Sequence, residues 1–156
     1  MCIKNLYQPT SDEKLPHFLQ ENIAKSIDLT GDAFFLKVFG SNPKVAEVYY
    51  EEFYKKIFYN GTVDLKIKEI IRLRLAGISG CKYCISIDEH SAMKNGVSEV
   101  EIFNAKNNKL DEFDDSLKNI LELVNHISLS KASERAEKEI IEKALKDFSQ
   151  EQFVEI

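Results

Sequence analysis

Two of the chain's three cysteines, Cys81 and Cys84, lie three residues apart in the stretch GCKYCISIDEH. Side chains at positions i and i+3 of a helix lie on the same face, so these two sulfur atoms can approach each other. Gly80 and Cys81 fall at the start of an expected helix, where free backbone N–H groups and the helix dipole favour a thiolate. Lys82 adds a nearby positive charge. Residue type and position therefore favour a redox-active pair.

Other uses of a cysteine pair fit the sequence less well. A structural zinc site usually has four Cys or His ligands, and the remaining candidates are scattered singly. They are Cys2, His17, His90 and His126. A buried, inert pair is disfavoured because helix starts are seldom sealed in a core. A thioredoxin-like interpretation requires a strand directly before the pair, whereas the preceding segment has a helical pattern. Zinc binding and an inert pair stay open as alternatives.

Three side chains are candidates for proton transfer beside the pair. Asp88 lies four residues after Cys84 and therefore on the same stripe of the helix. His90 lies six residues after Cys84, about 120° around a regular helix, so it is expected to face elsewhere. Glu69 lies in a strongly apolar helix, where a carboxylate is costly unless it is paired or used. It either pairs with Arg72, three residues on, or points at the cysteines as a general base.

The elements around these residues all have helical patterns. The segment 64–80 is apolar on nearly all sides, which predicts a central, buried helix. Sustained alternation typical of strands is nearly absent. We predict one all-α domain over residues 1–156. The expected helices cover residues 11–27, 31–42, 42–61, 64–80, 81–96, 98–106, 113–130 and 133–148.

Capping patterns support several of these helices. Asn42 followed by Pro43 is a good helix start, and Ser98 with Glu101 forms a capping box. At the end of the sequence, Ser149 and Gln152 form a second box that is followed by only about two turns of helix. This short segment either docks on the rest of the domain or leaves apolar surface uncovered.

Composition limits the classes of function. The net charge of −5 and the even spread of Lys and Arg argue against nucleic-acid binding. No apolar run approaches the ~20 residues of a membrane span, and the first residues lack the apolar core of a secretory signal. We therefore expect a cytoplasmic protein that binds neither nucleic acid nor membrane. Thiols are kept reduced in that compartment, so a close cysteine pair is expected to serve catalysis or metal binding.

The spacing of these residues resembles a known family. Glu69 precedes Cys81 by eleven intervening residues, Asp88 follows Cys84 by four, and Gly96 ends the helix. This arrangement resembles the alkylhydroperoxidase D / carboxymuconolactone decarboxylase-like family, whose signature is an acidic residue in a "K-E-L-I-x-L" helix that leads to "G-C-x-Y-C". The segment GVSEVEI also looks like the family's "G-L-S-x-x-E-I". The resemblance covers most of residues 30–156.

The resemblance implies an all-helical bundle that works as a homo-oligomer. It implies that Cys84 is the attacking thiolate, that Cys81 closes the disulfide and meets the reductant, and that Glu69 begins a proton relay. The substrate would be a hydroperoxide or a disulfide, and the reductant a dithiol or a lipoyl protein. The attack itself needs no metal or organic cofactor.

Two positions depart from the family pattern. Members with peroxidase activity carry His four residues after the second cysteine, where this chain has Asp88, and some carry a second His where it has Tyr83. Disulfide exchange is therefore expected more firmly than peroxidase turnover. Longer relatives continue through another helix after FVEI, so the domain is expected to lack that helix. Alternative functions are a carboxymuconolactone decarboxylase-like lyase, which would use carboxylates and His90, and a non-enzymatic helical oligomer that senses redox state.

Overall fold

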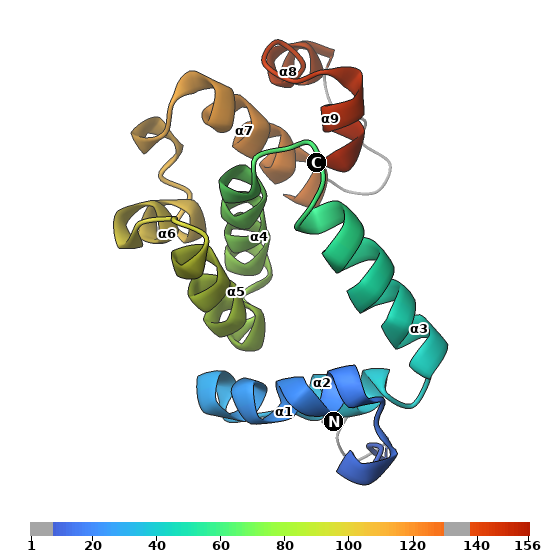
Figure 1. Cartoon of the computed structure of the whole chain (residues 1–156). Helices are drawn as coiled ribbons and strands as arrows, with labels where there is room; N and C mark the ends of the chain where they lie inside the picture. Colours follow the sequence, from blue (N-terminus) through green and yellow to red (C-terminus); the bar gives the residue numbers. More distant parts are fainter. Residues whose placement is uncertain (1–7, 130–137) are drawn as a thin grey trace. The chain divides into compact units, whose positions relative to one another are not determined.

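The computed structural model describes residues 8–129 and 138–156, and over these residues it contains helices and no strand (Figure 1). The predicted all-α fold class is confirmed. Cys2 and the first residues of the helix expected over 133–148 lie outside the described residues. The helices, with short 3-10 and π segments marked η, are η2 (Asp12–Lys14), α1 (His17–Thr30), α2 (Phe34–Phe39), α3 (Pro43–Glu47), η3 (Val48–Phe58), α4 (Leu65–Ser79), α5 (Lys82–Lys94), α6 (Glu99–Lys106), η4 (Leu110–Glu112), α7 (Asp115–Leu129), α8 (Lys138–Ala144) and α9 (Gln150–Glu155).

The chain packs as two compact units, residues 1–57 and residues 58–156. In the first unit, α1 and α2 enclose a small core. Pro16 explains why α1 begins later than the sequence pattern predicts, because proline lacks an N–H and disfavours helix in the residue before it. The buried apolar residues of this core are Leu15, Leu19, Ile23, Ala33, Leu36 and Ala46.

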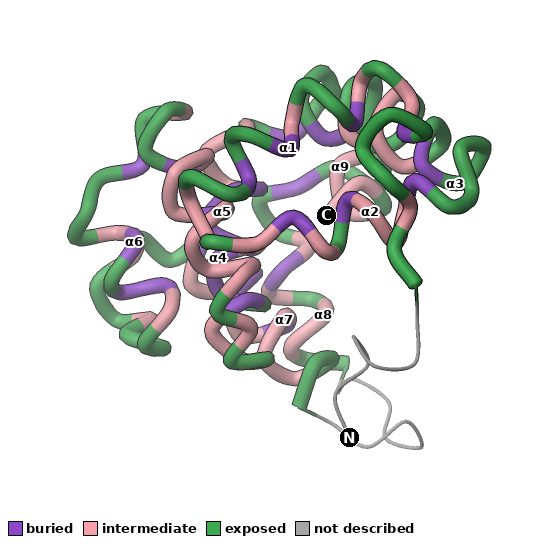
Figure 2. Tube along the Cα trace, turned by 90° about the horizontal axis from the view of Figure 1, so that it is seen from below, coloured by how far each residue is buried: buried purple, intermediate pink, exposed green. Residues whose placement is uncertain are grey.

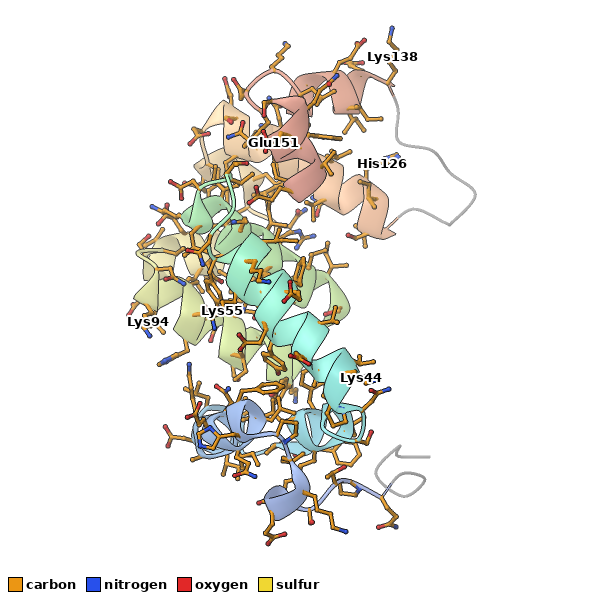
Figure 3. The ribbon with its side chains drawn as sticks, turned by 45° about the vertical axis from the view of Figure 1, so that its right-hand side comes forward. Lys44, Lys55, Lys94, His126, Lys138 and Glu151 are labelled. Atoms are coloured by element: carbon orange, nitrogen blue, oxygen red, sulfur yellow. A yellow bond between two sulfur atoms is a disulfide. The ribbon has the colours of Figure 1, made fainter. Side chains whose placement is uncertain are left out.

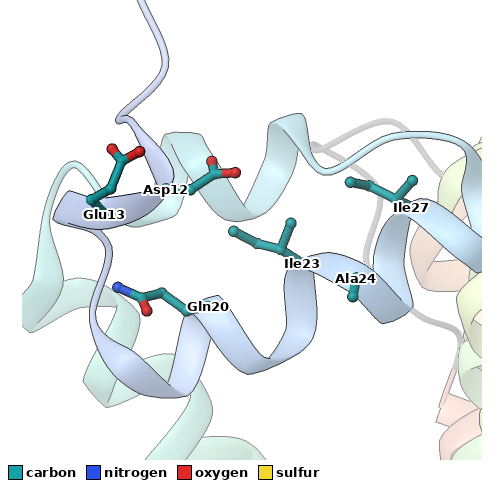
Figure 4. A pocket seen from close by; sticks show the side chains of 6 residues that line it. All are labelled: Asp12, Glu13, Gln20, Ile23, Ala24 and Ile27. Carbon is teal, nitrogen blue, oxygen red and sulfur yellow. The ribbon is translucent and has the colours of Figure 1, made fainter.

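A shallow hollow of about 410 Å³ lies between η2 and α1 of the first unit (Figure 4). It holds two carboxylates and no thiol or imidazole, so it offers none of the chemistry suggested by the sequence. Asp12, one of its carboxylates, is 2.7 Å from Lys37 Nζ. The lining residues are Asp12, Glu13, Gln20, Ile23, Ala24 and Ile27.

The helix expected over residues 42–61 starts as predicted but changes its winding. Asn42 caps α3 by accepting the N–H of Val45, and Pro43 occupies the first turn. From Val48 the chain continues as a π-helix, an uncommon form in which residues five apart come together. Tyr49 and Tyr54 are such a pair, with hydroxyl groups 3.5 Å apart and ring centroids 5.0 Å apart. Aromatic crowding accompanies this winding, which the apolar periodicity does not reveal.

The second unit is built around α4, which packs against α5, α6 and α7. Nearly half of α4 is buried and only Leu75 and Ser79 of this helix are exposed, in agreement with the central position that its nearly all-round apolar pattern predicts (Figure 2). Helix α7 in turn packs against α8. The buried apolar core is Ile70, Ile71, Leu73, Ala92, Val97, Ile102, Ala105, Leu117, Ile120, Leu121, Leu123, Ala144 and Phe148.

Gly77 allows α4 and α6 to approach each other closely. A Cβ atom at Gly77 would lie 2.5 Å from the Lys106 carbonyl oxygen and 3.0 Å from its Cα. Real Cβ atoms do not come so near a backbone, so only glycine fits at this crossing. The contact fixes the depth at which α6 sits on α4.

The capping boxes predicted at Ser98 and Ser149 are both present. The short helix α9, which the second box begins, docks on the start of α4 through Glu155. The Glu155 carboxylate accepts hydrogen bonds from both the N–H and the hydroxyl of Thr62 and from the N–H of Val63, and lies 2.7 Å from Lys68 Nζ. By contrast, Glu151 on the same helix is exposed (Figure 3). The Glu155 carboxylate therefore anchors the end of the described chain, together with Gln152, whose Nε2 atom donates to the Thr62 carbonyl oxygen, and with Phe153 and Ile156, which pack against the core.

Within residues 8–129 and 138–156, every helix is too short or too polar to span a bilayer.

Candidate active site

The site lies in the hairpin of α4 and α5 within the second unit. Asp64 caps α4 by accepting the N–H of Lys66, and Gly80 ends it in the left-handed region with φ of 61°. Glycine adopts this conformation without steric cost, so the chain can reverse within two residues. Cys81 is then the N-cap residue of α5, directly before its first residue, Lys82. The sequence folds locally so that the first sulfur of the pair sits at a helix N-terminus.

A disulfide joins Cys81 and Cys84, whose Cα atoms lie 5.3 Å apart. The Sγ atom of Cys81 also accepts the backbone N–H of Cys84 at 3.2 Å and thus serves as the cap of α5. Both cysteines are partly exposed. The predicted approach of the two sulfurs is confirmed, and their exposure leaves them open to a thiol or peroxide, which the inert alternative would not.

Beyond the cysteines, a polar stripe runs along the side of α5 that faces α4. Asp88, Ser91 and Asn95 lie four, seven and eleven residues after Cys84, spacings that repeat on one helical face. All three side chains bond to residues of α4. The interface between the two helices is therefore polar on this stripe, although most of α4 is apolar.

Glu69 is fully buried in this interface, with a relative exposure of 0%. Its Oε1 atom accepts hydrogen bonds from Ser91 Oγ at 2.6 Å and from Asn95 Nδ2 at 2.8 Å. Its Oε2 atom is buried without a hydrogen-bond partner and lies 3.6 Å from a guanidinium nitrogen of Arg72. Two neutral donors and one cation thus hold a carboxylate that burial alone would strongly disfavour.

Arg72 connects the two carboxylates of the site. Its Nε atom donates to Asp88 Oδ1 at 3.1 Å, and a second guanidinium nitrogen forms a closer ion pair with the same oxygen. The guanidinium carbon lies 4.9 Å from the centroid of the Phe58 ring. The Arg72 side chain is only 14% exposed. Two carboxylates and one aromatic ring therefore fix the position of this guanidinium.

Opposing effects act on the pKa of Asp88. Burial of the carboxyl group raises its pKa above the ordinary value, and the charge and hydrogen bonds of Arg72 partly offset that increase. Asp88 is 9% exposed, so water screens it little. Burial has the larger effect, so the pKa of Asp88 lies above its ordinary value although Arg72 lowers it.

The structure brings the predicted residues together in two groups. Cys81 and Cys84 share the disulfide, while Glu69 and Asp88 share Arg72. The partners of Glu69 on α5 lie seven or more residues past Cys84, which places its carboxylate about 10 Å along the helix axis at 1.5 Å per residue. Along α5, Asp88 lies between Cys84 and these partners of Glu69. The two remaining candidates, Tyr83 and His90, are partly exposed residues of α5.

Sequence reasoning missed the roles of Ser91 and Asn95 and the double contact of Arg72. The first two continue the stripe of Cys84 and Asp88, so extending that stripe by two more turns would have found them. The Arg72–Glu69 pairing was considered from the spacing, and the structure contains it. The contact of Arg72 with Asp88 crosses two helices and has no local signal.

In the described part of the chain, no three Cys, His, Asp or Glu side chains come together as a metal site requires.

The helical fold and the paired cysteines after a helix with a buried glutamate define a class of all-α, CxxC-containing proteins. Residues 45–108 match the carboxymuconolactone decarboxylase family, so this chain carries a domain of that family, within the alkylhydroperoxidase D-like superfamily. The matched segment contains α4, α5 and α6 and all the site residues described above. The resemblance stated from the sequence is confirmed.

The chain is also similar to a protein of Bacillus subtilis (strain 168) named uncharacterized protein YdfG. The two are 29% identical over 103 residues, which cover 65% of this chain and 69% of YdfG. No solved structure matches the chain significantly.

Proposed function

We propose that this protein is a thiol–disulfide oxidoreductase that cycles Cys81 and Cys84 between the dithiol and the disulfide. The observation that carries the proposal is the disulfide itself, partly exposed at the N-terminus of α5 in a domain of this family. A hydroperoxide or a disulfide is the proposed oxidant, and a dithiol or lipoyl group the proposed reductant. The net reaction with a hydroperoxide converts ROOH and the two thiols to ROH, water and the disulfide.

In the oxidative half, the Cys84 thiolate attacks the terminal peroxide oxygen and the O–O bond breaks. Cys84 becomes a sulfenic acid, and the alkoxide leaves as ROH after taking one proton. The Cys81 thiol then attacks the Cys84 sulfur and expels water, which forms the disulfide. The 5.3 Å separation of the two Cα atoms supports this step, because it falls in the range that a disulfide spans.

In the reductive half, a reductant thiolate attacks Cys81 Sγ and Cys84 leaves as a thiolate. The second thiol of the reductant then attacks the mixed disulfide and releases Cys81. The N–H of Cys84 points at Cys81 Sγ, and a hydrogen bond of this kind stabilises a departing thiolate. The capping geometry of α5 therefore supports Cys81 as the sulfur that meets the reductant.

The proton from Cys84 needs an acceptor. Glu69, proposed from the sequence as that acceptor, makes its contacts with Ser91, Asn95 and Arg72 and lies about 10 Å farther along α5 than Cys84. Any exchange between Glu69 and Cys84 must therefore pass through Asp88 or through water. Self-association, predicted from the resemblance, stays a prediction.

Turnover with a hydroperoxide and a small dithiol tests this proposal. We expect peroxide consumption that depends on the dithiol and is lost in Cys84→Ser and in Cys81→Ser, while Cys2→Ser serves as the control that keeps it. Mass spectrometry of the trapped protein should show the Cys81–Cys84 disulfide after peroxide and free thiols after dithiol. Peroxide or disulfide turnover that survives the double change at Cys81 and Cys84 would contradict the proposal, and a disulfide that resists the dithiol would as well.

A further inference from the structure

One charged side chain belongs to the segment that carries the disulfide. Lys82 is the only charged residue between Arg74 and Asp88, although charged residues make up 30% of the chain. The end of α4, the turn at Gly80 and the first turn of α5 therefore carry no other ionised side chain. Along the chain, Lys82 is also the charged residue nearest to both sulfurs.

Lys82 is close enough to Cys81 to act on a molecule that reacts there. It is the first residue of α5 and follows Cys81 directly. Adjacent Cα atoms lie about 3.8 Å apart, and the lysine stem has four carbons, so the ammonium group stays within about 10 Å of Cys81, or about one Debye length at 0.1 M salt. Lys82 is exposed and both cysteines are partly exposed. A molecule that reaches Cys81 Sγ therefore comes within range of this charge.

The charge of Lys82 is not neutralised by the carboxylates of α5, because these have other partners. Asp88 pairs with Arg72, and Glu89 pairs with Lys106 of α6. Within the part of the chain that the structure describes, Lys82 belongs to no ion pair. The positive end of the α5 dipole lies at the same end of the helix and has the same sign. The hairpin is thus positive beside its disulfide, although the chain as a whole carries a net charge of −5.

We propose that Lys82 is a specificity-determining residue: it makes the Cys81–Cys84 disulfide select a thiol reductant that carries an anionic group, such as a carboxylate or a sulfonate, close to its sulfur. The inference rests on the proposed thiol chemistry and names the class of reductant within it. Lys82 attracts the anionic group of the reductant while the reaction takes place at the neighbouring sulfur.

The reaction at the disulfide is a pair of thiol–disulfide exchanges. The reductant thiolate attacks Cys81 Sγ, a new S–S bond forms, and the bond to Cys84 breaks with Cys84 leaving as a thiolate. A second reductant thiolate, from the same dithiol or from another molecule, attacks the reductant sulfur of this mixed disulfide and releases Cys81. Overall, two reductant thiols and the protein disulfide give a reductant disulfide and two protein thiols.

Two thiols of similar size and different charge test the proposal. Mercaptoethanesulfonate carries a sulfonate, whereas mercaptoethanol is neutral. The disulfide form of a Cys2→Ser parent is mixed with each thiol at one pH and low salt, quenched with an alkylating agent at timed intervals, and its reduced fraction measured by mass spectrometry. The readout is the rate with the sulfonate divided by the rate with the neutral thiol. An effect of Lys82 on the leaving Cys84 thiolate is common to both thiols and cancels in this ratio.

The expected changes follow from Coulomb's law. One unit charge 4 to 8 Å away in water alters the local concentration of an opposite charge about threefold. Lys82→Gln should therefore lower the ratio about threefold and Lys82→Glu about tenfold, whereas Lys82→Arg should keep it. In the parent, raising the salt to about 1 M, where the Debye length is about 3 Å, should lower the ratio toward that of Lys82→Gln.

Lys94→Gln is the matched control. Lys94 is also an exposed lysine of α5, but it lies about 18 Å farther along the helix axis (Figure 3). Its removal should leave the ratio within about 1.5-fold of the parent, because that distance exceeds the Debye length at 0.1 M salt.

An equal fall of the ratio in Lys82→Gln and Lys94→Gln overturns the proposal, and so does a parent ratio that salt leaves unchanged, a measurement that requires no variant to fold. Reduction by both thiols with the same ratio in Lys82→Gln and the parent refutes the role of Lys82 alone. A disulfide that neither thiol reduces refutes the proposed function and this inference together. Absent peroxide turnover with the expected ratios refutes only the peroxide half of the proposed function.

Discussion

The anchor of α9 predicts a pH-dependent stability that one substitution should remove. Glu155 is 9% exposed and bonds to Thr62, Val63 and the buried Lys68. Burial by itself raises the pKa of Glu155, but its bonds to Lys68, Thr62 and Val63 outweigh burial and lower the pKa from 4.5 to about 2. Glu155→Gln keeps one oxygen acceptor, for the N–H of either Thr62 or Val63, and removes the charge beside Lys68.

The size of the effect follows from the change in pKa. A fall from 4.5 to about 2 corresponds to about 3 kcal/mol of folding free energy when the group is ionised, at about 1.4 kcal/mol per pH unit. Because the pKa is lower in the folded state, this contribution is complete above about pH 5 and is lost as the pH falls through the folded pKa. At pH 3 less than about half of it should remain.

Urea unfolding of the wild type and Glu155→Gln between pH 3 and pH 7 measures this contribution. We expect the variant to be less stable by about 3 kcal/mol at pH 7, with the difference shrinking to about half or less at pH 3. Glu151→Gln, on the exposed side of the same helix, is the control and should change stability by less than about 0.5 kcal/mol. A loss below about 1 kcal/mol at pH 7, or a difference that does not vary with pH, would refute the reasoning.

Three further substitutions test the α4–α5 hairpin and its contact with α6. Ser91→Ala removes a donor from the buried Glu69 carboxylate and should cost about 1–3 kcal/mol in urea unfolding; a cost below about 0.5 kcal/mol would count against the bond. Gly77→Ala forces a Cβ atom against the Lys106 backbone and should lower stability by about 1–3 kcal/mol, measured by thermal unfolding, despite the better helix propensity of alanine. In the reduced protein, Cys81→Ala should be about 1 kcal/mol less stable in urea than Cys81→Ser, because only serine can replace the sulfur cap; equal stabilities would contradict this.

Much of the second unit could be predicted from its sequence because its helix signals are local. Asp64 and Gly80 bracket α4, and the capping boxes at Ser98 and Ser149 are where the side-chain patterns place them. The π-helix η3 could not be predicted in the same way. Its apolar stripe fits an ordinary helix, and the choice between the two windings depends on how neighbouring aromatic rings pack.

The site shows the same division between local and distant effects. The meeting of Cys81 and Cys84 follows from a three-residue spacing at a helix start, which the sequence displays directly. The partner of Asp88 is a residue sixteen positions earlier, and only the crossing of α4 and α5 determines that pairing. The position of Glu69 farther along α5 than Cys84 likewise depends on the register of α4 against α5. No sequence pattern within either helix encodes that register.

One aromatic side chain of the second unit lies beside both the Arg72–Asp88 ion pair and the Lys68–Glu155 ion pair. The Phe58 ring has the Arg72 guanidinium 4.9 Å from its centroid and the Lys68 ammonium at 5.5 Å. The electron-rich ring thus lies beside two cations, one of which pairs with Asp88 while the other pairs with Glu155 of α9. Because the Phe58 ring contacts the cation of each ion pair, a smaller side chain at this position would remove a packing contact from both pairs at once.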